Sequence, residues 1–499
     1  MSMWRWLIPL VLMLASCHAA PPSPGLLRVG LAQLPLTLDP RFATDAASVR
    51  VQELIHRGLL RLDDTFQAEG DLAESWQHPE PLIWQFRLRE GLHFSDGSKL
   101  TAADVAATYN AVLNPDLASP LRAAFDAVQR VEANGDRTVR FYLKRPDASL
   151  LPRLNLGILP VALAGKPQQP RNTLGCGLFA LAAWNQSGLT LERVGAHPAD
   201  SFTTIHFSAV KDPVTRVLKM ARGELDFVEN DLPPYLLGYL RKQPSLTMQT
   251  RSSTTFSYLG INLHDRQLKD LRVRQALALS LDRHQLKKAL FADLPVLAET
   301  MLVPAHWAAV NLPETSFDPV KAAMLLDQAG FPLHADGIRF SITYRTSTDP
   351  ARLQLATAIA AMWRRVGIDV HIESLEWGGF YARIKQGDFQ VFSLAWVGNS
   401  DPDIYRWVLH SSMWPPKGSN RGRYANPQVD AWLDQASAST DADERKKLYG
   451  RVEWQMYADM VYIPLWYEPV IAVSGARLGG FTPAADGSLL GLASAFRTE

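Results

Sequence analysis

Two hydrophobic periods alternate along this chain, one typical of helices and the other of strands. Apolar residues recur every three or four positions in residues 49–55 and 359–366, which is the spacing of one helix face. They occupy alternate positions in residues 83–88 and 368–372, as in half-buried strands. Residues 26–31 form an apolar run that predicts a first strand. Helix followed by strand, several times over, predicts α/β layers with mixed sheets.

Polar residues next to these runs mark where helices begin. Asp45 precedes the first helical run and predicts an N-cap. Thr101 and Asp104 form a capping-box-like pair before another run. Asn426 followed by Pro427 predicts a third helix start, with Asn426 as the cap.

The stretch from residue 376 to 405 combines these patterns with residues suited to ligand binding. A helical run ends at Gly387, an apolar strand covers residues 389–395 and ends in Trp396, and residues 397–403 are irregular. A buried strand that delivers a Trp and polar groups into a loop is a common way to build a ligand site. The alternative is a core strand followed by an Asx-Pro turn. The stretch taken alone favours that alternative.

Composition narrows the class of protein. The chain has 499 residues, of which 47% are hydrophobic and 20% charged, so it is an ordinary globular sequence long enough for two or three domains. The net charge of +1, without long runs of one sign, gives no electrostatic reason to expect a nucleic acid or an anionic membrane surface as partner. The 14 tryptophans favour an aromatic binding surface, with core packing as the alternative.

The N-terminus predicts export. Arg5 supplies a positive charge, residues 6–15 are apolar, and Leu-Ala-Ser-Cys ends at Cys17. This ending resembles the lipobox of bacterial lipoproteins, which implies a signal peptide over residues 1–16, a lipid on Cys17 and a tether over residues 17–25. A plain secretory signal with a chance cysteine is the alternative. No other stretch has the length and polarity of a transmembrane helix. With Cys17 lipidated, Cys176 has no partner for an intrachain disulfide.

Motifs of known chemistry are missing from the sequence. There is no phosphate-binding Gly-x-x-x-x-Gly-Lys-Ser/Thr loop, no His-Glu-x-x-His, no Cys-x-x-Cys and no nucleophile elbow. The 12 histidines are scattered, and no pair has ligand spacing on one helix face. We therefore expect no catalytic residues, no cofactor and no metal site.

One segment carries a family resemblance. Residues 84–112, WQFRLREGLHFSDGSKLTAADVAATYNAV, resemble the signature of family-5 extracytoplasmic solute-binding proteins, the dipeptide, oligopeptide and nickel-type receptors of ABC importers. The positions that fit are Trp84, Phe86, Leu88, Arg89, Gly91, Phe94, Asp96, Gly97, Leu100, Thr101, Ala102, Asp104 and Val105. Further segments similar to the family's motifs are residues 38–40, 173–179, 258–262, 270–277 and 424–430.

The resemblance implies the architecture of a type II periplasmic binding protein: two α/β lobes with mixed sheets, an extra domain, and a hinge between the lobes. In that family the first lobe is discontinuous. The segments expected here are residues 26–44, 171–257 and 471–499 for lobe I, 45–170 for extra domain II, and 258–470 for lobe III.

The resemblance also implies which residues contact a ligand. Trp377 and Trp396 would provide flat apolar surface. The other expected ligand contacts are Tyr258, Gly398, Asn399, Ser400, Asp401 and Cys176. Asn399 stands where peptide-binding members carry an aspartate that pairs with the ligand's α-ammonium, and Ser393 stands where some carry an arginine. These departures argue against specificity for free peptides.

Alternatives remain open for two of these residues. Asp401, like Asp403, could replace the missing aspartate or could cap the turn at Pro402. Cys176 replaces the usual threonine near the site between the lobes, or it is a small buried filler.

The implied protein is a monomeric, lipid-anchored, extracytoplasmic receptor. It would capture a peptide or other small solute between its lobes and deliver it to ABC permease subunits in the inner membrane. The alternatives are an exported hydrolase, recognised by a base hydrogen-bonded to a nucleophile in the cleft, and a binding or regulatory module without an importer. Neighbouring permease and ATPase genes would separate the last reading from the first.

Overall fold

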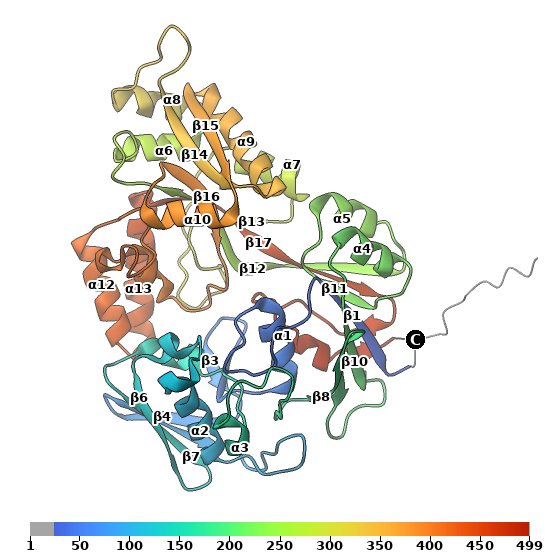
Figure 1. The fold of residues 1–499 in the computed structure, drawn as a ribbon. Coiled ribbons are helices and arrows are strands. Elements are labelled where there is room, and N and C mark those ends of the chain that lie inside the picture. The colour runs from blue at the N-terminus through green and yellow to red at the C-terminus, as the bar shows by residue number, and fades with distance from the viewer. Residues whose placement is uncertain (1–23, 499) are drawn as a thin grey trace, which may run out of the picture.

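The computed structural model describes residues 24–498, which form two α/β lobes and a smaller domain (Figure 1). Within these residues, eleven strands form one mixed sheet that runs through both lobes, in the order β15-β14-β16-β12-β17-β11-β1-β10-β9-β8, with β13 paired to β17. The strands of this sheet are β1 (Leu26–Leu31), β8 (Phe179–Asn185), β9 (Gly188–Arg193), β10 (Thr204–Ala209), β11 (Phe227–Glu229), β12 (Leu246–Ile261), β13 (Val296–Leu297), β14 (Phe340–Ser347), β15 (Ile368–Leu375), β16 (Val391–Trp396) and β17 (Tyr462–Gly475). The predicted fold class is confirmed.

Two long antiparallel strands, β12 and β17, belong to both lobes. Their pairing begins at Leu246 opposite Gly475. Near that end β17 also pairs with β11 of the N-terminal lobe, and at the other end β12 pairs with β16. The register between β12 and β17 is interrupted between Ser252 and Phe256. Because such irregularities bend and twist a strand locally, this is the natural position for a hinge.

The N-terminal lobe, lobe I, packs its helices around β1, which pairs in parallel with β10 and β11. Its helices and short strands are α1 (Ala46–Ile55), α4 (Pro213–Ala221), α5 (Pro234–Leu240), η5 (Leu490–Ala493), β18 (Leu478–Gly479) and β19 (Phe496–Arg497). Leu54 and Ile55 of α1 share a core with Leu27 and Val29 of β1. The domain boundary at residue 45 stays a prediction, and this packing favours moving it past Ile55.

The extra domain is an antiparallel sheet in the order β4-β5-β7-β6 with α2 packed on it. Its elements are β2 (Leu60–Leu62), β3 (Ala68–Gly70), β4 (Ala73–Glu80), β5 (Ile83–Leu88), β6 (Val128–Asn134), β7 (Thr138–Leu143), α2 (Ala102–Leu113), α3 (Val161–Ala164), η1 (Pro115–Leu117), η2 (Arg122–Phe125) and η3 (Ala148–Arg153). Tyr109 of α2 packs edge-on against Phe141 of β7, with ring centroids 4.9 Å apart. The predicted capping box is confirmed, since the Thr101 N–H donates to the Asp104 carboxylate at 2.8 Å.

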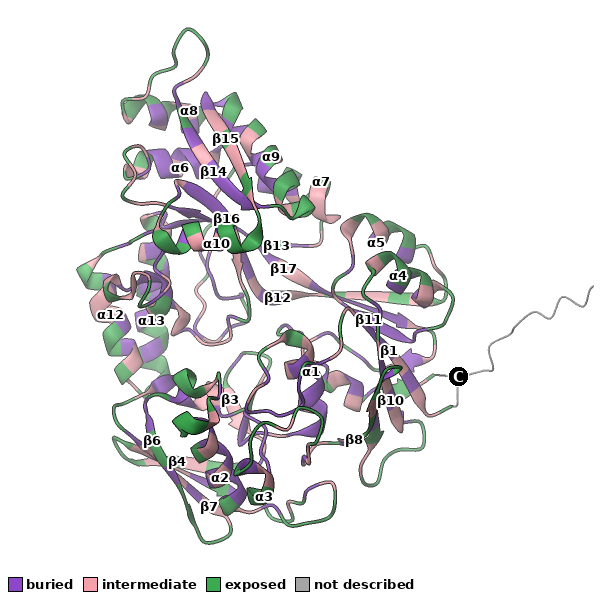
Figure 2. Ribbon diagram, viewed as in Figure 1, coloured by how far each residue is buried: buried purple, intermediate pink, exposed green. Residues whose placement is uncertain are grey.

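The helices of lobe III cover both faces of its half of the large sheet. Its helices are α6 (Leu271–Leu279), α7 (Arg283–Phe291), α8 (Pro319–Gln328), α9 (Pro350–Arg365), α10 (Trp377–Gln386), α11 (Ile404–Leu409), η4 (Ser411–Met413), α12 (Pro427–Ala438) and α13 (Ala442–Ala458). Leu259 and Val391 pack with α6, α8 and α9, whereas their chain neighbours Tyr258 and Phe392 pack with α10 to α13. Figure 2 shows buried residues concentrated along these strands and exposed residues on the outer faces of the helices.

Most element ends agree with the sequence signals. Asp45 caps α1, and Asn426 caps α12, as predicted. The helix expected from the apolar spacing of residues 359–366 begins earlier, at Pro350, because Asp349 accepts a hydrogen bond from the Arg352 N–H and caps an earlier first turn. An Asp-Pro pair is itself a helix-start signal, and the apolar period alone did not reveal it.

Candidate functional site

Helix α10 presents an exposed aromatic surface. Its start is fixed by the Glu376 carboxylate, which accepts a hydrogen bond from the Gly378 N–H at 2.8 Å. Trp377, at the first helical position, is 54% exposed. Its ring stacks on Tyr381 one turn later, with centroids 5.6 Å apart and planes 8° apart. Trp377 is thus placed as a solute-facing residue requires, and its contact with a ligand stays a prediction.

Trp396 ends strand β16 beside this surface. Its half-buried ring lies parallel to that of Tyr258 on β12, with centroids 6.1 Å apart. The two strands are hydrogen-bonded neighbours, with Phe256 opposite Trp396. Tyr258 is fully buried, so in this structure it supports the Trp396 ring from behind. A direct ligand contact is therefore better suited to Trp396 than to Tyr258.

Arg421 lies among these aromatic rings and was not identified from the sequence. It comes from the loop between η4 and α12 and is 7% exposed. Its Nη1 donates to the Tyr258 hydroxyl and its Nη2 to the Tyr381 hydroxyl, both at 3.1 Å. Its guanidinium carbon lies 4.4 Å from the Trp396 ring centroid, a cation–π distance. Among residues 24–498, no carboxylate forms an ion pair with it.

The loop after β16 turns Asn399 inward. Gly398 has φ of 73°, a left-handed conformation that glycine adopts without strain, and is exposed. Asn399 is 4% exposed, its backbone N–H donates to the Thr254 carbonyl, and its side-chain amide donates to the Met301 carbonyl at 3.4 Å. The Ser400 carbonyl contacts His306 Nε2 at 3.2 Å. Asn399 and Ser400 thus bond to the protein itself, and their ligand roles stay predictions.

Asp401 and Asp403 connect lobe III to the extra domain. The Ser149 hydroxyl of η3 lies 3.2 Å from an Asp401 oxygen and 2.6 Å from an Asp403 oxygen. Asp403 also accepts hydrogen bonds from the hydroxyls of Tyr449 and Ser437. Loss of water around the carboxylate, and then the charge of Asp403, raise the pKa of Asp401 to about 6. Both carboxylates are engaged within the protein. The Asp403 N–H also donates to Asp401, as the capped turn predicts.

Cys176 lies apart from the aromatic rings on α10 and β16. Cys176 precedes β8 and packs, half-buried, against the core of the extra domain. Burial raises the pKa of its thiol to about 11, so the thiol is neutral near pH 7 and unsuited to nucleophilic chemistry. This favours the small-filler alternative. Cys17 lies outside the described residues.

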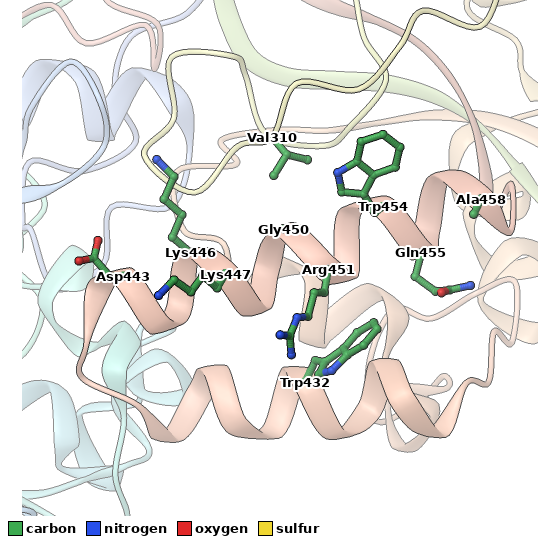
Figure 3. Close-up of a pocket in the computed structure, with 10 residues that line it drawn as sticks. All are labelled: Val310, Trp432, Asp443, Lys446, Lys447, Gly450, Arg451, Trp454, Gln455 and Ala458. Atoms are coloured by element: carbon green, nitrogen blue, oxygen red, sulfur yellow. The ribbon is translucent and has the colours of Figure 1, made fainter.

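The hollows of the described chain include two that lie away from these aromatic rings. A polar cavity of about 430 Å³ next to α1 and β12 is lined in part by Glu53, His56 and Arg251. Burial raises the pKa of Glu53 to about 7 and lowers that of His56 to about 4. An open groove of about 850 Å³ lies on α12 and α13, where Figure 3 shows Trp432 and Trp454 on its two helices. Neither hollow contains a residue that the sequence predicted for ligand binding.

The structure of residues 24–498 bears on metal binding and on membrane insertion. In this range no group of three or more His, Cys, Asp or Glu side chains is arranged to hold a metal ion. Across the same residues, none of the helices combines the length and the apolar character needed to span a bilayer.

Comparisons with known proteins identify the family. The model for bacterial extracellular solute-binding proteins, family 5 (middle), matches residues 67–414. The chain is 25% identical over 479 residues to the oligopeptide-binding protein AppA of Bacillus subtilis, covering 90% of this chain and 87% of that protein. It is 27% identical over 470 residues to the glutathione-binding protein GsiB of Escherichia coli, covering 89% of each.

Solved structures give the same fold. NikA of Brucella suis in complex with Fe(III)-EDTA superposes with a TM-score of 0.84 at 24% identity, covering 95% of this chain and 100% of that one. CtaP of Listeria monocytogenes superposes with a TM-score of 0.84 at 22% identity, covering 95% and 99%. The family match and the shared two-lobe fold lead to one assignment. The chain belongs to the family-5 bacterial extracellular solute-binding proteins, the binding proteins of ABC importers.

Proposed function

We propose that this protein is a lipid-anchored extracytoplasmic receptor that captures a peptide or peptide-like solute between its lobes and delivers it to an ABC permease in the inner membrane. The aromatic surface made by Trp377, Tyr381 and Trp396 carries this proposal. It lies on α10 and β16 of lobe III, and β16 is the direct neighbour of crossing strand β12. In Figure 1, α10 and β16 lie above strand β12, and α1 lies below it.

Names of relatives support the solute class. AppA is named for oligopeptides and GsiB for glutathione, which is peptide-like, and both match nearly the full length of this chain. Flat aromatic rings contact the apolar parts of many side chains without strong discrimination, which suits a receptor for varied peptides. That this chain binds a peptide-like solute is part of our proposal.

Closure about β12 and β17 would provide the signal to the permease. Two lobes joined by crossing segments close around a ligand by bending at a few connecting residues. A ligand that contacts both lobes stabilises the closed form, and only this difference in affinity can drive closure. The interrupted register at Ser252–Phe256 supplies the bending point. No chemical change of the solute is part of the proposal.

A thermal-shift screen of peptides on the mature chain tests solute capture. A ligand at 100 times its Kd raises the unfolding free energy by about 2.7 kcal/mol, which gives a clear rise in Tm. Trp396→Ala should weaken peptide binding by roughly tenfold, because a stacked aromatic contact is lost. Trp454→Ala is the matched control, since Trp454 is 49% exposed and lies in the separate groove on α13.

The screen can also overturn the proposal. Absence of a Tm rise with any peptide, confirmed by calorimetry, would remove peptides as the solute class. Recovery of a chemically altered peptide after incubation would favour the hydrolase alternative instead.

The lipid anchor is tested by Cys17→Ser. We expect the wild-type protein in the membrane fraction, and the variant either released or retained with an uncleaved signal peptide. Cys176→Ser is the control, because it removes a thiol without changing the lipobox. Identical processing and identical membrane retention in wild type and Cys17→Ser would contradict lipidation at Cys17.

A further inference from the structure

Arg421 is exceptional among the buried arginines of the described chain. The others are Arg41, Arg216, Arg274, Arg283, Arg339, Arg345 and Arg445. Each of these donates to at least one carboxylate or backbone carbonyl, as when Arg283 pairs with Glu299 or Arg216 binds the Val210 carbonyl. Within residues 24–498, Arg421 donates only to two phenol oxygens. Burying a guanidinium costs several kcal/mol unless an anion or strong acceptors compensate it.

Three acids on or next to α10 and β15 have other partners. Asp388 and Glu373 pair with Arg345, and Glu376 caps the start of α10. A second cation adds to the positive charge, since the Lys385 ammonium lies 5.1 Å from the Tyr381 ring centroid. The region around Tyr381 therefore has excess positive charge next to an exposed aromatic surface.

We propose that Arg421 anchors a carboxylate of the solute, so that the aromatic surface on α10 and β16 receives an anionic, peptide-like ligand. This inference rests on the proposed solute-capture function and adds a charge requirement to it. A guanidinium carries five N–H donors, and two of them are used by Tyr258 and Tyr381, so three remain. A carboxylate is the ligand group that this planar fork matches best.

Tyr381 contributes to the same recognition. Its hydroxyl oxygen accepts from Arg421, which leaves its own O–H proton to donate to a bound carboxylate. Tyr381 and Trp396 are both half-buried and flank Arg421, so a ligand group reaches the guanidinium past these two rings. A carboxylate held by the guanidinium and the phenol together would compensate the charge of Arg421, which has no ion-pair partner among residues 24–498.

The loop after β16, residues 397–403, has no carboxylate left unengaged to receive an ammonium. Asn399 is neutral and turned toward Met301. Asp401 and Asp403 bond to Ser149 at the junction with the extra domain. The expected ligand class is therefore a peptide-like solute with a free carboxylate and no need for a free amine.

Calorimetry with matched ligands tests the inference. The probes are N-acetylated Ala-X-Ala tripeptides, with X varied over apolar and aromatic residues, each as the free acid and as the C-terminal amide. Wild type should bind the acid about tenfold to hundredfold more tightly than the amide, the range expected for a hydrogen-bonded charged group. Arg421→Gln should remove this preference, and Arg421→Lys should retain part of it, because the charge stays while the fork is lost.

A neighbouring arginine provides the control. Arg423→Gln makes the same charge change two residues away, at an exposed position whose guanidinium lies over Trp414 instead. It should leave the acid-to-amide ratio unchanged. If Arg421 only held the tyrosines in place, Arg421→Gln would weaken the binding of acid and amide equally, and the ratio of their affinities would stay as in wild type.

Outcomes separate this inference from the proposed function. Equal binding of acid and amide by wild type would overturn the carboxylate anchor and leave peptide capture standing, even if Arg421→Gln failed to fold. Failure of wild type to bind any acid or amide in the series would overturn both.

Discussion

Asn399 shows how one residue's surroundings decide its role. Its sequence position implied contact with a ligand but no ion pair with a ligand ammonium, and its side-chain amide bonds to the Met301 carbonyl while the residue is only 4% exposed. A hydrogen bond to a charged partner contributes about 1.5–3 kcal/mol, against about 1 kcal/mol for a neutral pair. Without an aspartate at this position, a free peptide amine has no charged partner here that would make it bind more tightly than an N-acetylated amine.

We predict that wild type does not favour a free α-amine. Affinities for a tripeptide and its N-acetylated form should agree within about threefold, whereas an ammonium–aspartate pair would separate them by about tenfold or more. Calorimetry on the two peptides measures this directly. A preference of tenfold or more for the free amine would show that another acid receives it.

Glu453 makes stability depend on pH. It is fully buried on α13, where its two oxygens accept hydrogen bonds from the Tyr405 hydroxyl at 2.6 Å and the Val310 N–H at 2.9 Å. Burial raises the pKa of Glu453 to about 8. The folded protein therefore binds more protons than the unfolded chain between about pH 4.5 and 8, so the unfolding free energy falls as pH rises through that window.

We predict that Glu453→Gln flattens this dependence. Between pH 6.5 and 8.5 the wild type should lose about 2 kcal/mol through Glu453, while the neutral glutamine loses none of it. Denaturant unfolding of both proteins at several pH values measures the difference. Asp443→Asn, at an exposed position of the same helix, should follow the wild-type curve. Parallel curves for wild type and Glu453→Gln would rule out a raised pKa at Glu453.

At the scale of elements, two glycines of one helix have opposite requirements. Gly387 ends α10 with φ of 79°, where a side chain is strained, whereas Gly379 lies inside the helix with open space around its Cβ position. Left-handed C-cap positions favour glycine, and helix interiors favour alanine over glycine by about 0.5–1 kcal/mol.

We predict opposite signs for the two alanine variants. Gly387→Ala should lower the unfolding free energy by about 1 kcal/mol, and Gly379→Ala should raise it by up to about 1 kcal/mol. Chemical denaturation of both variants against wild type gives the signs. If Gly379→Ala destabilised the protein as much as Gly387→Ala, the difference in backbone conformation and space between the two positions would not determine the stability of α10.

Local elements were predictable because their causes are local. Asp45 and Asn426 cap helices by accepting hydrogen bonds from N–H groups two or three residues later, and Asp104 accepts one from the Thr101 N–H three residues earlier, so sequence spacing reveals all three. The pairing of β12 with β17 joins residues about two hundred positions apart. No local period records which distant strand is the partner, so the sheet that connects the lobes could be expected only through the family resemblance.

Part of the candidate site was predictable from the sequence, and part was not. Trp396 stood out as the aromatic residue that ends a strand, and Trp377 was expected through the family resemblance. Arg421 did not stand out, because its environment is made by Tyr381 and Tyr258, which lie 40 and 163 residues away in the sequence. An arginine in a polar loop ordinarily points into solvent, and only the folded chain shows that this one is buried.

At the scale of the whole molecule, the extra domain contacts both lobes. Arg41 of lobe I donates from its Nη1 to the Ala164 carbonyl of the extra domain at 2.7 Å. On the other side, Ser149 bonds to Asp401 and Asp403 of lobe III. Closure must therefore either preserve the Ser149 contacts or exchange them, whereas the crossing strands β12 and β17 remain continuous through both lobes.

Ligand-induced closure is the last prediction. A compact chain of this length has a radius of gyration of about 23 Å, so an open form should lie above this value and move toward it when a solute bridges the lobes. Small-angle scattering with a saturating N-acetylated tripeptide acid should show this decrease, with the peptide recovered intact. The matching amide, at the same concentration, should give a smaller change because it populates the closed form less. An unchanged radius at saturation would mean that β12 and β17 hold the lobes at a fixed angle, and capture would then have to occur on one lobe alone.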